Sequence, residues 1–119
     1  MPAPVVLKEF RYGGIGFRGP LDWEGAKGLA SLTSEGKNRE EGQGTRPAWV
    51  RWTGPSATLA FLAGGPPPPV RIHPDEPFFN WAVPGAGDVR MDPGAPLVQR
   101  MRFLVPDGPL EPSAIEALR

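Results

Sequence analysis

Apolar and polar residues alternate along several short segments of this chain, and prolines and glycines separate these segments. In the clearest segment, 48–53, Trp49 and Arg51 point to one face while Val50 and Trp52 point to the other. The same pattern predicts about eight strands, at 5–10, 15–18, 29–34, 48–53, 58–63, 70–73, 78–83 and 97–105. Their hairpin spacing predicts an antiparallel, all-β fold.

Helical patterns are short. Ser113 and Glu116 favour a C-terminal helix over 112–118, and one helical turn is predicted at 22–27. Neither is long enough to connect two parallel strands, so a β-sandwich of about eight strands is expected rather than a parallel α/β sheet. The polar stretch 35–46 predicts a loop, and the prolines of 64–69 predict an extended segment without sheet hydrogen bonds.

Composition narrows the classes of function. The 119 residues fit one domain, residues 1–119, and the formal net charge is zero, which argues against nucleic-acid or membrane-surface binding. The chain has no cysteine, so disulfides and thiolate chemistry are excluded. It has no apolar run near the roughly 20 residues of a membrane span. We expect a soluble, cytoplasmic domain with no cofactor.

His73, the one histidine, lies beside Asp75 and Glu76 in a predicted turn. This grouping suits an acid–base pair or part of a metal site. A metal would need further carboxylates from other loops, for example Glu35 or Asp88. The alternative, which we favour, is a surface turn in which Asp75 bonds nearby main chain, so no metal site is expected.

A second motif is rejected on its context. Gly14, Gly16 and Gly19 match the spacing of a dinucleotide-binding loop, but Pro20 follows and no sustained helix begins there. Phosphate binding by that loop depends on the helix N-terminus, so a chance match in a glycine-rich segment is favoured.

Aromatic and basic residues supply the candidate ligand site. Most of Phe78, Phe79 and the tryptophans are expected in the core, but an exposed Trp81 beside Asn80 and an arginine would suit a sugar ring. Arg100 and Arg102 share one face of the last predicted strand. Such a pair is either a solvated face or the binding site of a carboxylate that relieves its repulsion.

Four segments carry a resemblance to a known family. They are RYGGIGFRGP, LTSEGK, GTRPAWVRWTG and RIHPDEPFFNWAVPGAGDVRMDPGAPLVQRMRFLVPDG. In this order they resemble the C-terminal part of the methane oxygenase PmoA-like family, a domain of unknown function. The resemblance implies a β-rich sandwich and a context of carbohydrate metabolism. Where the family has tyrosines this chain has Leu97 and Met101, and Pro106 stands where a histidine is expected.

Two functions follow as hypotheses, and whether the domain is an enzyme stays open. The first is a module that binds or processes a carbohydrate or sugar acid, with His73 and Glu35 as the candidate proton carriers. Its ligand-binding residues would be Arg18, Asn80, Trp81, Arg100 and Arg102. The second is a non-catalytic interaction module. Family members are typically longer, so we expect uncovered sheet edges and a homodimer or a partner subunit that covers them.

Overall fold

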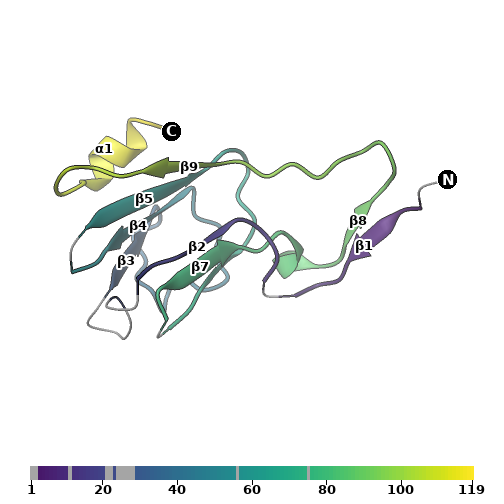
Figure 1. Cartoon of the computed structure of the whole chain (residues 1–119), viewed down its shortest axis with the longest axis horizontal. Coiled ribbons are helices and arrows are strands. Elements are labelled where there is room, and N and C mark those ends of the chain that lie inside the picture. Colours follow the sequence, from purple (N-terminus) through teal and green to yellow (C-terminus); the bar gives the residue numbers. More distant parts are fainter. Residues whose placement is uncertain (1–2, 11, 21–22, 24–28, 56, 75) are drawn as a thin grey trace.

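Two antiparallel β-sheets face each other across a core of aromatic side chains in the computed structural model of this chain (Figure 1). The structure describes residues 3–10, 12–20, 23, 29–55, 57–74 and 76–119. Within them the strands are β1 (Val5–Leu7), β2 (Gly16–Arg18), β3 (Ala30–Thr33), β4 (Trp49–Thr53), β5 (Thr58–Ala63), β6 (Val70–Ile72), β7 (Phe78–Trp81), β8 (Val89–Met91) and β9 (Met101–Leu104). The described ranges also contain a 3₁₀ turn, η2 (Val83–Ala86), and a helix, α1 (Pro112–Glu116).

The strands form one large sheet, one smaller sheet and a ribbon. The four-stranded sheet has the order β3-β4-β5-β9, and the three-stranded sheet has the order β2-β7-β6. The strands β1 and β8 pair only with each other, and Figure 1 shows this ribbon apart from the two sheets, near the N-terminus. Every pairing is antiparallel, which confirms the predicted all-β class.

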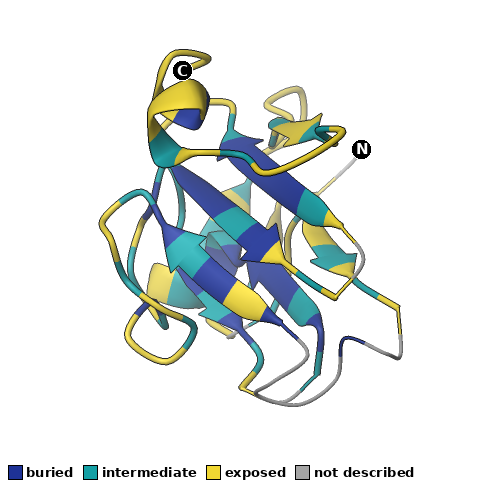
Figure 2. Ribbon diagram, turned by 90° about the vertical axis from the view of Figure 1, so that its left-hand side faces the viewer, coloured by how far each residue is buried: buried dark blue, intermediate teal, exposed yellow. Residues whose placement is uncertain are grey.

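The hairpin of β4 and β5 forms the centre of the four-stranded sheet. Its alternation is the predicted one: Val50 and Trp52 are fully buried between the sheets, whereas Trp49 packs on the opposite face. β5 is buried on both faces, as Figure 2 shows, because one face meets the three-stranded sheet and the other lies under α1. A strand covered on both sides reads as a continuous apolar run, which explains the sequence TLAFLA.

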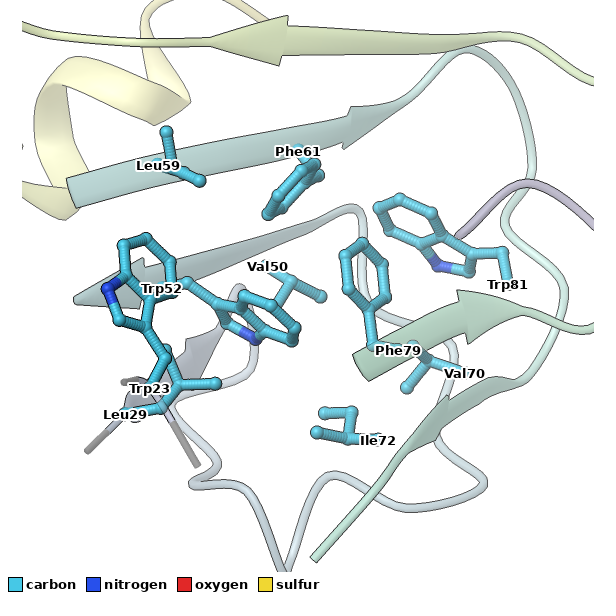
Figure 3. Close-up of a cluster of buried hydrophobic side chains, with 10 residues drawn as sticks. All are labelled: Trp23, Leu29, Val50, Trp52, Leu59, Phe61, Val70, Ile72, Phe79 and Trp81. Carbon is cyan, nitrogen blue, oxygen red and sulfur yellow. The ribbon is translucent and has the colours of Figure 1, made fainter. Parts of the chain in front are cut away.

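Aromatic rings fill the space between the two sheets (Figure 3). The rings of Phe61 and Phe79, from opposite sheets, have centroids 4.7 Å apart. Trp52 meets both of them edge-on, at 5.8 Å from Phe61 and 5.3 Å from Phe79. Such ring pairs contribute about 0.5–1.5 kcal/mol each beyond the apolar area that they bury.

The helix α1 covers the other face of the four-stranded sheet. Ile115 is fully buried against Trp49 and Leu62. The indole N–H of Trp49 donates a hydrogen bond of 2.7 Å to a carboxylate oxygen of Glu116. Although short, the helix is therefore anchored by both an apolar and a polar contact.

Several predicted elements differ from the structure, beginning with the strand expected at 5–10, which spans Val5–Leu7. β9 spans only Met101–Leu104, because beyond the hydrogen bond from Gly64 to Arg100 the prolines that follow β5 offer no N–H groups with which 97 and 98 could pair. The strand expected at 78–83 ends at Trp81, and η2 begins at Val83. β8 was not predicted, since its three residues lie in a stretch rich in glycine and proline. Of the helical turn predicted at 22–27, all but Trp23 lies outside the described residues.

Gly14 marks the place where the chain enters the three-stranded sheet. A Cβ at this position would lie 1.9 Å from the main-chain oxygen of Trp81. We expect Gly14→Ala to lower the free energy of unfolding by about 1–3 kcal/mol, the usual range for overpacking. Gly108→Ala is the matched control, since nothing lies within 4 Å of its Cβ position. Urea denaturation of both variants checks this, and equal midpoints would contradict it.

The contact between Trp49 and α1 should depend on pH. The hydrogen bond from Trp49, and then the interaction with Arg119, lower the pKa of Glu116 below its ordinary value of 4.5. Because the folded chain favours the carboxylate, this contribution to stability is complete above about pH 4.5 and is lost as the pH falls through the lowered pKa.

The variant Glu116→Gln isolates this effect because it keeps an acceptor but removes the charge. We expect the difference in melting temperature between wild type and variant to be largest at pH 7 and to shrink by pH 3. Tryptophan fluorescence during thermal unfolding measures it, with Glu111→Gln as an exposed control on the same segment. A difference that stays constant with pH would contradict this role of Glu116.

Candidate functional site

His73 lies in the tight turn between β6 and β7 and serves to hold it. Its Nδ1 accepts a hydrogen bond of 2.9 Å from the main-chain N–H of Glu76, and its main-chain N–H donates to the main-chain oxygen of Phe78. Arg39 donates from Nε to the main-chain oxygen of His73 at 2.7 Å, and from Nη2 to that of Glu76. Asp75, the other predicted member of this turn, lies outside the described residues.

Glu35 lies in a different turn, directly after β3. It is exposed, and its main-chain N–H bonds to the hydroxyl of Thr33. Within the described part of the chain, no hydrogen bond or ion pair joins its side chain to His73. The two candidate proton carriers are therefore not coupled in this structure.

Arg18 and Asn80 lie on the outer face of the three-stranded sheet, away from the core. Both Nη atoms of Arg18 lie 3.3 Å from one carboxylate oxygen of Glu76, and its guanidinium lies 5.2 Å from the ring centroid of Phe78. The ion pair is half exposed, a setting in which such pairs contribute about 0–1 kcal/mol. Arg18 is thus held by partners from this chain.

Asn80 is buried, with 2% of its surface exposed, and neither polar atom of its amide has a hydrogen-bond partner among the residues that the structure describes. Arg71 lies directly opposite it across β6 and β7, and the buried Nε of Arg71 also lacks a partner. On its other side is Gly16, which leaves no side chain over the amide. An unpaired buried polar group costs about 1–3 kcal/mol, so Asn80 is a source of local instability.

Arg100 and Arg102 border a surface hollow, which we name the arginine groove. It encloses about 1000 Å³, beside the segment Gly64–Pro67. Arg100, Arg102 and Arg119 line it together with apolar side chains such as Leu62 and Met101. Its described lining contains no acidic residue.

The three arginines of the groove differ in how they are held. Arg119 forms an ion pair of 3.0 Å with Glu116, and Nη2 of Arg102 donates to the main-chain oxygen of Leu118. The Arg100 guanidinium has no hydrogen bond or ion pair with any described residue, and its side chain is exposed. Among the described residues of the groove, Arg100 is therefore the guanidinium available to an anion.

Gln99 fixes the wall of the groove, a role that the sequence analysis missed. Its Oε1 accepts a hydrogen bond of 2.7 Å from the N–H of Ile15, and its Nε2 donates to the oxygen of Trp81 at 3.3 Å. The amide thus bridges two strands at a point where their direct pairing is incomplete. One signal was present: Gln99 is the polar exception on the otherwise apolar face that it shares with Met101 and Phe103.

Trp81 separates the two groups of candidate residues. Its ring is buried, at 1% exposure, and packs edge-on against Phe79 at 5.4 Å. It also borders a second hollow of about 330 Å³ that shares Gly64, Gln99 and Arg100 with the arginine groove. The structure thus brings Trp81 close to Arg100, although they come from different sheets. Arg18 and Asn80 lie on the outer face of the sheet that contains Trp81, and His73 lies in the turn after β6.

Two further searches cover the described residues. No three histidine, aspartate or glutamate side chains among them gather closely enough to hold a metal ion. No helix in the described ranges has the length and apolar character needed to cross a membrane.

The fold and groove define a small β-sandwich domain with a basic surface hollow. A family model described as a family of unknown function (DUF6807) matches residues 1–119. The chain belongs to this family. Neither a curated protein nor a solved structure matches the chain.

The unpaired amide of Asn80 can be tested by an apolar replacement. We expect Asn80→Leu to raise the free energy of unfolding by about 1 kcal/mol, because it removes two unsatisfied polar atoms at similar volume. The same change at Asn38 should have the opposite sign, since the Asn38 side chain accepts hydrogen bonds from Glu40 and Glu41. Chemical denaturation of both variants measures the difference. A destabilised Asn80→Leu protein would mean that the amide is satisfied in solution.

Proposed function

We propose that this domain binds a small anionic carbohydrate, such as a sugar acid, in the arginine groove. The observation that carries the proposal is the Arg100 guanidinium, which lacks a partner among the described residues and faces a hollow whose described lining is free of acidic groups. A guanidinium matches a carboxylate in its planar geometry and forms two parallel hydrogen bonds with it. The arginine would therefore bind the acid group of the ligand.

The rest of the groove suits a sugar ring. Its volume of about 1000 Å³ is at the upper end of the usual range for small-molecule sites, which leaves room for one or two rings. Pro66, Pro67 and Met101 offer apolar surface to C–H groups, while Arg102 offers N–H donors to hydroxyls. The resemblance of the chain to the PmoA-like family, with its context of carbohydrate metabolism, supports the same class of ligand.

Binding is favoured over catalysis at this site. General acid–base chemistry needs a group that exchanges protons near neutral pH. The titratable side chains in the described lining of the groove are arginines, which stay protonated. His73 and Glu35 line neither the groove nor the hollow beside it.

Calorimetric titration with glucuronate and galacturonate tests the proposal, with glucose as the uncharged match. We expect a uronate to bind and glucose to bind at least tenfold more weakly. Arg100→Ala should weaken uronate binding about ten- to hundredfold, since a hydrogen bond to a charged group contributes about 1.5–3 kcal/mol. Arg90→Ala is the control, because Arg90 pairs with Asp92 on the ribbon.

Equal affinity for glucose and for the uronates would refute the assignment of a carboxylate. Unchanged uronate binding by Arg100→Ala would refute the assignment of the groove. The absence of any uronate binding at millimolar concentration would refute the proposed class of ligand.

A further inference from the structure

β9 is an edge strand whose outer side is free. The main-chain N–H of Gly64 donates to the oxygen of Arg100 at 2.8 Å, which fixes the alternation of hydrogen bonds along the strand. The main-chain groups of residues 100, 102 and 104 therefore face β5, whereas those of 101, 103 and 105 face away from it. None of these outward N–H and C=O groups has a hydrogen-bond partner among the described residues.

The same edge exposes apolar side chains. Phe103 is 46% exposed and Val105 is 63% exposed. On its inner side the Phe103 ring contacts Phe17 and Phe61, so the edge is well anchored to the core. Proteins usually block such edges with lysines, prolines or bulges. The segment 101–105 contains no lysine and no proline. Its pairing with β5 runs residue by residue, without a bulge. Figure 1 shows β9 along the border of its sheet, beyond β5.

We propose that two copies of this chain pair through β9, antiparallel, about a two-fold axis at Phe103. In this register Phe103 lies opposite Phe103 of the second copy, and Met101 lies opposite Val105 of the second copy. Each outward main-chain group then has a hydrogen-bond partner. The two four-stranded sheets then become one continuous sheet of two copies. An interface of this kind is self-complementary, as a two-fold axis requires.

The charges along 100–107 favour this register over its neighbours. They also favour a second copy of the chain as the partner of β9. With the axis at Phe103, Arg102 lies opposite Leu104, and Asp107 of one copy comes to the end of the strand where Arg100 of the other begins. An axis at Met101 would place Arg100 opposite Arg102, and like charges directly opposite each other destabilise a strand pair. An axis at Val105 would pair Phe103 with Asp107, where the chain already turns.

Light scattering at several concentrations, with Val105→Pro and Val105→Ala, tests the pairing. We expect wild type and Val105→Ala to approach twice the chain mass of 12.8 kDa as concentration rises. Val105→Pro should weaken association about tenfold or more, because it removes an outward N–H in each copy and no hydrogen bond within the chain. Circular dichroism should show both variants folded.

A charge exchange provides the second, independent measurement. Arg100→Asp and Asp107→Arg should each weaken the dimer, and the double variant should recover it, which a loss of folding would not produce. A wild type that stays monomeric at millimolar concentration would overturn the proposal. So would a Val105→Pro protein that dimerises as wild type does. Arg100 belongs to both the groove and this contact, so uronate binding is measured separately by calorimetry on wild type and Val105→Pro, and not on the charge-exchange variants.

Discussion

The contact between the rings of Phe61 and Phe79 joins the two sheets of this domain. No strand is shared between the four-stranded and the three-stranded sheet, so side chains must hold them together. The two rings meet at 4.7 Å, and Trp52 packs edge-on against both of them. The edge strand β9 joins the same cluster through Phe103, whose ring contacts Phe61 of β5 and Phe17 of β2.

The groove forms where the main chain after β5 no longer offers N–H groups for sheet pairing. After β5, four consecutive prolines prevent further sheet pairing, and 97–100 runs alongside them without forming a strand. The two segments join at the hydrogen bond from Gly64 to Arg100, and the hollow beside it is bordered by Arg100 and, from β9, by Arg102. The same proline run that limits β9 therefore creates the hollow that we assign to a ligand.

Much of the fold could be predicted from the sequence, because alternation reports burial directly. Trp49 and Trp52 were placed on opposite faces, and the structure confirms it. β8 is not predicted because its three residues lie in a stretch rich in glycine and proline, where turns are expected. The site was harder to predict: proximity between Arg18 and Glu76, or between Gln99 and Ile15, depends on which strands become neighbours, and periodicity within one segment holds no such information.

The amide of Gln99 takes the place of a peptide group between Ile15 and Trp81. One end accepts and the other donates, so this position needs both functions at once. Slow hydrolysis of the amide to a carboxylate would leave two oxygen acceptors, one of them facing the carbonyl of Trp81, and would set a negative charge beside Arg100. Chemical ageing at a single side chain would thus loosen the junction of two strands and neutralise the groove in the same event.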